Sequence, residues 1–172
     1  EVFKAASPLI EKIKKDPPDV IGLTNYIWNN NLSIAVASLA KKMNPNTLVV
    51  FGGPEIDKNP KNKSITSNKY SIADFFVQHE GEIAFAEIVK KYIEFDRNKK
   101  KLREEILNLG NCFIIEKGNI ISGPNLHRLE DLDDTPSPYT TGLFDKFLIN
   151  PDYMPMIQTN RGCPFSCTFC QE

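Results

Sequence analysis

The chain has 172 residues, of which 41% are hydrophobic and 25% charged, and its formal net charge is −1. This composition is typical of a globular protein and provides no global positive field that would attract nucleic acid or an anionic membrane surface. The longest apolar runs, at 34–37 and 47–51, are too short to cross a bilayer. We therefore expect no nucleic-acid partner and no membrane span.

The two ends of the chain lead to two further expectations. The first residues are charged and helix-like and do not resemble a signal peptide, so we expect a cytoplasmic protein. The chain starts at Glu1 and stops at Glu172, two residues after a cysteine cluster. We therefore expect it to be a fragment of a longer protein.

The first 95 residues alternate between helical and strand-like patterns. Three stretches carry apolar residues at helical spacing: 2–13, 32–43 and 85–93. Three shorter apolar runs are typical of buried strands: 19–24, 47–51 and 74–77. Alternation with short connections predicts parallel βαβ units, that is, an α/β fold with a doubly wound sheet and helices on both faces.

Beyond residue 96 the pattern changes. A short helix precedes two β-rich runs, 113–115 and 120–121, which flank a Gly-Asn turn and predict a hairpin. Residues 129–138 are acidic and contain prolines, as linkers do, and 156–159 has the pattern of a new strand. We expect three parts: an α/β domain at 1–95, a helix, hairpin and linker region at 96–154, and the start of a further domain at 155–172.

Three of the four cysteines, Cys163, Cys167 and Cys170, are clustered with the spacing C-x3-C-x2-C. A disulfide framework would spread its cysteines over the fold, so the cluster indicates a reducing compartment and a metal or redox role. Three thiolates on one loop can hold an iron–sulfur cluster and leave one iron open to a ligand with nitrogen and oxygen donors. Cys112 lies alone in an apolar stretch and is expected to be a buried free thiol.

Two other chemistries fit part of the cysteine pattern. A zinc site would need a fourth ligand, and His79 and His127 are the available histidines. Cys167 and Cys170 could instead form a thioredoxin-type redox pair, but this reading leaves Cys163 unexplained.

The cysteine spacing, with aromatic Phe169 directly before Cys170, resembles the signature of the radical S-adenosylmethionine (SAM) enzymes over residues 157–170. The resemblance implies that the three cysteines hold a [4Fe–4S] cluster and that SAM chelates its fourth iron. It also implies that Phe169 packs near the SAM adenine and that the strand at 156–159 is the first of a truncated partial (β/α) barrel. In that family the reduced cluster cleaves SAM to a 5′-deoxyadenosyl radical, which removes hydrogen from the substrate. A one-electron donor such as flavodoxin or ferredoxin is the implied partner.

The upstream α/β region resembles the cobalamin (B12)-binding domain of B12-dependent radical SAM enzymes over roughly residues 1–95. Three motifs carry the resemblance: 18–24, 50–54 and 79–82. It implies a flavodoxin-like or Rossmann-like sheet in which Thr24, at a strand end, faces the nucleotide tail of the corrinoid. It also implies that Gly52 and Gly53 let this tail pass close to the backbone, as ligands do at the carboxyl ends of parallel strands.

Some residues depart from that pattern or extend it. The family motif at 79–82 usually reads Gly-Glu-Gly-Glu, and His79 takes its first position here, where we expect a surface or capping residue. No Asp-x-His-x-x-Gly loop with a cobalt-ligating histidine is present. Either it precedes Glu1, or cobalamin is bound without a protein ligand. Tyr26, Trp28 and Asn29 follow the first strand, where they either line the corrin pocket or pack within the loop.

Together the two resemblances imply a radical SAM enzyme with an N-terminal cobalamin domain, acting on a small-molecule substrate. Methyl transfer from methylcobalamin to a carbon is the leading reaction, with cyclisation and rearrangement as others, and this chain alone is expected to be inactive. A second hypothesis is a cobalamin-binding carrier or sensor whose cysteines bind a structural metal. A third is a flavodoxin-like domain that binds a nucleotide, which is weakened because no G-x-G-x-x-G follows a strand.

Overall fold

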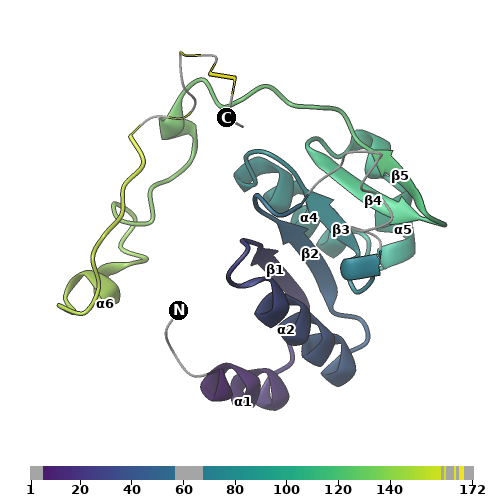
Figure 1. Cartoon of the computed structure of the whole chain (residues 1–172), viewed down its shortest axis with the longest axis horizontal. Coiled ribbons are helices and arrows are strands. Elements are labelled where there is room, and N and C mark those ends of the chain that lie inside the picture. Colours follow the sequence, from purple (N-terminus) through teal and green to yellow (C-terminus); the bar gives the residue numbers. More distant parts are fainter. Residues whose placement is uncertain (1–5, 57–67, 160, 162–164, 166, 169–172) are drawn as a thin grey trace. The chain divides into compact units, whose positions relative to one another are not determined.

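A computed structural model describes residues 6–56, 68–159, 161, 165, 167 and 168 of the chain. They fall into two compact units, Glu1–His127 and Arg128–Glu172. The first unit contains α1 (Ser7–Lys15), β1 (Val20–Thr24), α2 (Asn30–Met43), β2 (Leu48–Gly52), β3 (Phe75–Val77), α4 (Glu82–Glu94), α5 (Lys99–Glu104), the 3-10 turn η1 (Ile106–Asn108), β4 (Cys112–Glu116) and β5 (Asn119–Ser122) (Figure 1).

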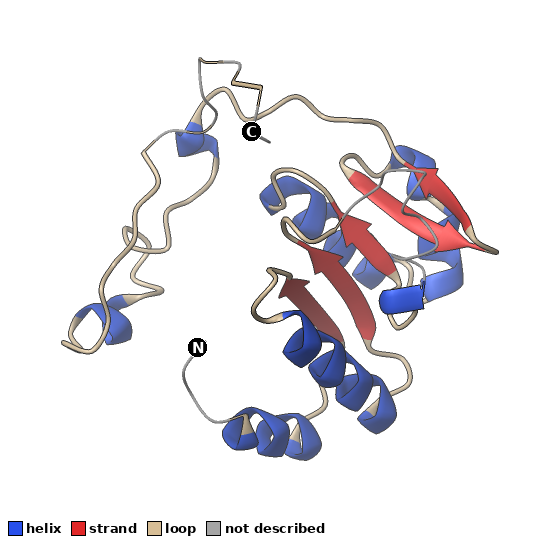
Figure 2. Cartoon of the chain, viewed as in Figure 1, coloured by secondary structure: helices blue, strands red, loops and turns tan. Residues whose placement is uncertain are grey.

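The first unit is built on a five-stranded sheet with the order β1-β2-β3-β4-β5 (Figure 2). β1, β2 and β3 run parallel, whereas β4 is antiparallel to β3 and β5 is antiparallel to β4. In the first ladder, Val20 lies opposite Leu48 and Thr24 lies opposite Gly52. The two strands therefore end side by side, with their carboxyl ends at the same edge of the sheet.

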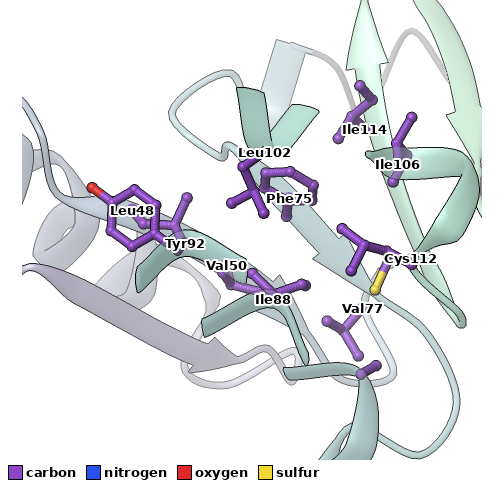
Figure 3. Packing of buried hydrophobic residues seen from close by; sticks show 12 residues of the cluster. Leu48, Val50, Phe75, Val77, Ile88, Tyr92, Leu102, Ile106, Cys112 and Ile114 are labelled. Atoms are coloured by element: carbon purple, nitrogen blue, oxygen red, sulfur yellow. The ribbon is translucent and has the colours of Figure 1, made fainter. Parts of the chain in front are cut away.

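Helices pack on both faces of this sheet, as the alternating pattern predicts. Leu48 and Val50 of β2 belong to a buried cluster with Ile88 of α4, which α5 and η1 complete (Figure 3). Val49 and Phe51 of the same strand face the other way, into a cluster that contains part of α2. β2 is thus apolar on both faces, which is the pattern of a central strand in a doubly wound sheet.

The hairpin β4–β5 extends the sheet. Phe76 of β3 lies opposite Phe113 of β4, and their rings stack with centroids 4.6 Å apart. The sequence places this hairpin in a linker region, because its turn is recognisable locally but its partner strand is far away in sequence. Burial of Phe113 against β3 and α2 makes the hairpin part of the core of the first unit.

An ion-pair cluster ties the opposite end of the sheet to the helices. Asp74, just before β3, accepts a hydrogen bond from Val49 N at 2.8 Å and pairs with Lys41 of α2 at 3.0 Å. Lys99 of α5 lies 3.4 Å from the same carboxylate and donates to Thr47 O at 2.6 Å. Burial lowers the pKa of Lys99, and the charge of Asp74 opposes that effect. This cluster is therefore structural.

The second unit has little regular structure, namely η2 (Leu132–Asp134) and α6 (Asp145–Leu148). Residues 156–159 form no strand, although the sequence predicts one, and all four are exposed. A strand needs a neighbouring strand to pair with, and no strand among the described residues pairs with this segment. Within the described ranges, the longest helix is α2 with 14 residues, and no helix has the length and apolar character that spanning a membrane requires.

Candidate functional site

The loops that follow β1, β2 and β3 meet at the carboxyl edge of the parallel strands. Thr24 ends β1 and is exposed, and it lies directly opposite Gly52 in the ladder. Gly53 then begins the turn after β2, and His79 follows β3 before α4 starts. Ligands of open α/β sheets bind at this edge, so Thr24, Gly52 and Gly53 are brought together where the sequence expects them.

The two glycines differ in what a side chain would meet. Gly53 has a φ of +92°, and a Cβ there would lie 2.7 Å from the backbone N and O of Asn25 and 2.9 Å from Thr24 Cγ2. A Cβ on Gly52 would meet its nearest atom, Val77 O, at an ordinary 3.5 Å. Gly53 is thus required by the packing of the protein itself. A Cβ on Gly52 would make only ordinary contacts with Val77, so the packing of the protein does not require a glycine there.

Asn25 is the polar residue beneath this edge, and the sequence does not single it out. Its side chain is 0% exposed, and its amide nitrogen donates to Leu23 O at 3.0 Å and to Gly52 O at 3.3 Å. These two carbonyl acceptors fix the orientation of the amide, because a flipped amide would place oxygen against oxygen. The buried Oδ1 then accepts no hydrogen bond from any described residue.

The loop between β1 and α2 is closed by Asn29. Its amide nitrogen donates to Thr24 O at 2.9 Å, and its Oδ1 accepts from Tyr26 N at 2.8 Å. These bonds hold Thr24 at the turn. Both polar atoms of the Asn29 side chain are therefore bonded within the loop. Packing within the loop is one of the two roles expected for Asn29, and lining the corrin pocket is the other.

Above this loop, Tyr26 and Trp28 form an exposed aromatic pair. Their rings stack with centroids 4.6 Å apart and an interplanar angle of 8°. Trp28 is 64% exposed and Ile27, between them, is 79% exposed. Exposed apolar side chains are common singly, whereas here three consecutive ones, Tyr26, Ile27 and Trp28, follow the carboxyl end of β1.

His79 is exposed and has a φ of +53°, in the left-handed region that glycine adopts freely. Directly before His79, the backbone N–H of Gln78 donates a hydrogen bond to Asn111 O at 2.9 Å, which fixes the chain at the end of β3. A left-handed backbone explains why a glycine suits this position of the motif. Histidine is one of the residues that tolerate it better than most.

The cysteine motif lies partly outside the described residues. Cys163, Cys170 and Phe169 are in the part that the structure does not describe, and Cys167 is exposed. Cys112 is buried, as predicted, and its Sγ donates to Gly110 O at 3.0 Å. Burial raises the pKa of Cys112 to about 12, so this thiol is inert at neutral pH. Within the described ranges, no group of three or more His, Cys, Asp and Glu side chains could hold a metal ion.

The fold defines an α/β domain in which three parallel strands present their carboxyl ends at one edge of the sheet. The model of the B12 binding domain matches residues 2–89, and the chain therefore belongs to the B12-binding domain family. The resemblance to B12-domain radical SAM proteins is likewise confirmed.

Curated relatives match over most of the chain. A cobalamin-dependent radical SAM methyltransferase, TokK of Streptomyces tokunonensis, is 34% identical over 89% of this chain and 22% of its own length. An uncharacterized methyltransferase of Pyrococcus horikoshii, PH0819, is 31% identical over 96% of this chain and 34% of its own length. The 2-(S-pantetheinyl)-carbapenam-3-carboxylate methyltransferase of Streptantibioticus cattleyicolor is 30% identical over 89% of this chain and 22% of its own length. The chain thus spans only a fifth to a third of these relatives.

Proposed function

We propose that the chain is the cobalamin-binding part of a radical SAM enzyme that transfers a methyl group to a carbon of a small-molecule substrate. The observation that carries the proposal is the occurrence, in one chain, of a B12-binding domain and a C-x3-C-x2-C motif. The relatives named as cobalamin-dependent radical SAM and carbapenam methyltransferases support it.

The residues at the sheet edge fit a corrinoid. Thr24 is exposed and can bond the nucleotide tail, and Gly52, which lies opposite it in the ladder, is proposed to let the tail pass close to the backbone. The stacked rings of Tyr26 and Trp28 offer an apolar surface to the corrin macrocycle. When bound, cobalamin would carry the methyl group, and a cluster with SAM would supply the radical. The role of these residues is to bind, orient and shield.

At the other end of the sequence, we propose Cys163, Cys167 and Cys170 as the three ligands of a [4Fe–4S] cluster. Phe169 is proposed to lie against the adenine of SAM bound at the fourth iron. The spacing of the cysteines and the names of the relatives support this assignment. The cluster would receive its electron from a donor such as flavodoxin or ferredoxin.

Methyl transfer is favoured over ring closure by the relatives. Three of those that match this chain at 30% identity or more are named methyltransferases. Proteins named anaerobic magnesium-protoporphyrin IX monomethyl ester cyclase, from Rubrivivax gelatinosus and Cereibacter sphaeroides, are 25% identical. Cyclisation is therefore the second candidate reaction.

The test compares the complete protein with a variant in which Cys163, Cys167 and Cys170 are all changed to alanine. After anaerobic reconstitution with iron and sulfide, we expect about four iron and four sulfide per wild-type chain. We expect the variant to hold none and to bind hydroxocobalamin as the wild type does. One zinc and no sulfide per wild-type chain would instead favour a carrier or sensor with a structural metal. Binding of flavin in place of hydroxocobalamin would remove the cobalamin assignment.

A further inference from the structure

Asn25 joins the carboxyl ends of β1 and β2 through both its backbone and its side chain. Its backbone N–H donates to Gly52 O at 2.7 Å, and its backbone carbonyl accepts from Glu55 N at 3.2 Å. Its amide nitrogen donates to Leu23 O at 3.0 Å and to the same Gly52 O at 3.3 Å. This residue thus connects the end of β1, the end of β2 and the turn that follows β2.

The turn after β2 is built around the backbone of Asn25. Gly53 has a φ of +92°, and a Cβ there would lie 2.7 Å from both Asn25 N and Asn25 O. Ile56 N donates to Gly53 O at 3.1 Å and closes the turn. The position of Asn25 therefore sets the path of the chain after Gly52, because close-packed groups transmit a displacement to their neighbours.

The side chain of Asn25 supports this arrangement from a buried position. It is 0% exposed, whereas Thr24, directly before it, is exposed at the candidate site. A buried donor has no bulk water to replace it, and an oxygen in place of this nitrogen would face the carbonyl oxygens of Leu23 and Gly52. Asn25 can therefore act on a ligand at this edge only through its neighbours.

We propose that Asn25 is a positioning residue, which sets the separation between Thr24 and the turn at Gly52 and Gly53. The proposed function assigns these three residues to the nucleotide tail of the corrinoid, so the inference rests on that proposal for the identity of the ligand. The groups of a binding site have to be held within about 0.5 Å of their productive geometry. A tail that bonds Thr24 and passes beside Gly52 therefore needs both at a fixed separation.

A second buried hydrogen bond joins the same two strands at their amino ends. Thr47, just before β2, is 0% exposed, and its Oγ1 donates at 2.7 Å to the carbonyl oxygen of Pro18, just before β1. Thr47 thus matches Asn25 in burial and in the kind of link it makes, but it lies at the edge of the sheet opposite the candidate site. Thr47→Val, which removes the hydroxyl and keeps the branched shape, is therefore the matched control.

Asn25→Asp is the direct test, because it keeps the shape of the side chain and replaces the amide nitrogen with an oxygen. Asn25→Ser is the second variant and decides the test if Asn25→Asp does not fold. Its side chain is smaller, and its hydroxyl can still donate to one of the two carbonyls. All variants are made in the complete protein, and thermal unfolding shows which of them are folded.

Two measurements follow the positioning with and without ligand. In protein without cobalamin, we expect the Glu55 amide, which donates to Asn25 O, to exchange its hydrogen about tenfold faster in Asn25→Asp than in the wild type. In an absorbance titration, we expect Asn25→Asp to bind hydroxocobalamin about tenfold more weakly. Asn25→Ser should change both quantities about threefold in the same direction, and Thr47→Val should match the wild type in both.

A double-mutant cycle distinguishes positioning from a general loss of stability. Thr24→Val alone should weaken hydroxocobalamin binding about tenfold, because it removes the hydroxyl that is proposed to bond the tail. In the Asn25→Asp or Asn25→Ser background the same change should weaken binding by only about threefold, since Thr24 is already displaced there.

The outcomes separate this inference from the proposed function. A wild type that binds no hydroxocobalamin removes the proposed function, and the inference with it. A wild type that binds it as well as, but no better than, the folded Asn25 variants overturns the inference alone. Unchanged exchange of the Glu55 amide in these variants also overturns it. So does an equal loss of affinity in Thr47→Val, or a Thr24→Val effect that is the same in every background, because the role of Asn25 would then be structural only.

Discussion

The two units of the molecule are stabilised in different ways. The first contains side chains such as Phe51, Phe75 and Ile88 that are 0% exposed, on both faces of one sheet. None of the described residues of the second unit is buried, and Leu143 and Met154 are 69% and 88% exposed. The first unit thus has a core that can position a ligand site by itself. The second contains turns and two hydrogen bonds between the Tyr139 hydroxyl and the backbone of Met156.

The largest expected contrast between the units is the reactivity of their cysteines. In protein without iron, iodoacetamide at pH 8 should modify exposed Cys167 roughly a thousandfold faster than buried Cys112, because the raised pKa of Cys112 leaves almost no thiolate. Mass spectrometry of digested samples measures both rates. Equal rates in folded protein would contradict the burial of Cys112, and equal rates in urea are the control.

The same thiol links stability to pH. Its folded pKa of about 12 lies above the ordinary value of 9.0, so the folded state favours the protonated form. This contribution is complete below the unfolded pKa and is lost as pH rises from about 9 towards 12. Cys112→Ser should reduce the steepness of the loss in unfolding free energy over that range. Denaturant titrations at pH 8 and pH 10.5 measure it, and an unchanged slope would contradict the assignment.

Truncation of one side chain in each unit sharpens the comparison. Ile88→Ala removes a fully buried side chain from the cluster on one face of the sheet and should lower the free energy of unfolding by about 3 kcal/mol. Leu143→Ala, in the second unit, should change it by less than about 0.5 kcal/mol, since that side chain is largely exposed. Urea denaturation measures both, and similar losses would mean that the units are not stabilised differently.

Substitutions at the two adjacent glycines distinguish a residue that the fold requires from one that is proposed to contact the ligand. Gly53→Ala should destabilise the protein by about 2 kcal/mol, because its Cβ would lie 2.7 Å from the Asn25 backbone at a positive φ. Gly52→Ala should leave thermal stability nearly unchanged and weaken hydroxocobalamin binding about tenfold, if the tail passes beside this residue. An absorbance titration measures the affinity. Wild-type affinity in folded Gly52→Ala would place the tail elsewhere.

The sequence predicts the elements of the first unit better than those of the second. β1, α2, β2 and α4 follow from periodicity, because each buries an apolar face whose spacing is visible in the chain. The attachment of the β4–β5 hairpin to β3 is not visible, because it depends on a pairing between distant residues such as Phe76 and Phe113. The strand predicted at 156–159 is absent for the opposite reason. Its local pattern is strand-like, but no described neighbour pairs with it.

The candidate site shows a similar limit. Motif resemblance leads to Thr24, Gly52 and Gly53, and the structure places them at one edge. Asn25 is missed, because its importance lies in a buried oxygen without a described partner, which no spacing reveals. Its place directly after Thr24, as a polar residue between a buried strand and exposed aromatics, is the signal that could have found it.

The central proposal is that Cys163, Cys167 and Cys170 hold a [4Fe–4S] cluster with one iron open to SAM. The most direct test is the electron paramagnetic resonance spectrum of the reduced, reconstituted complete protein, recorded with and without SAM. We expect the signal of a reduced [4Fe–4S] cluster whose g-values shift when SAM is added. A protein without such a signal, or a signal that SAM leaves unchanged, would contradict the account.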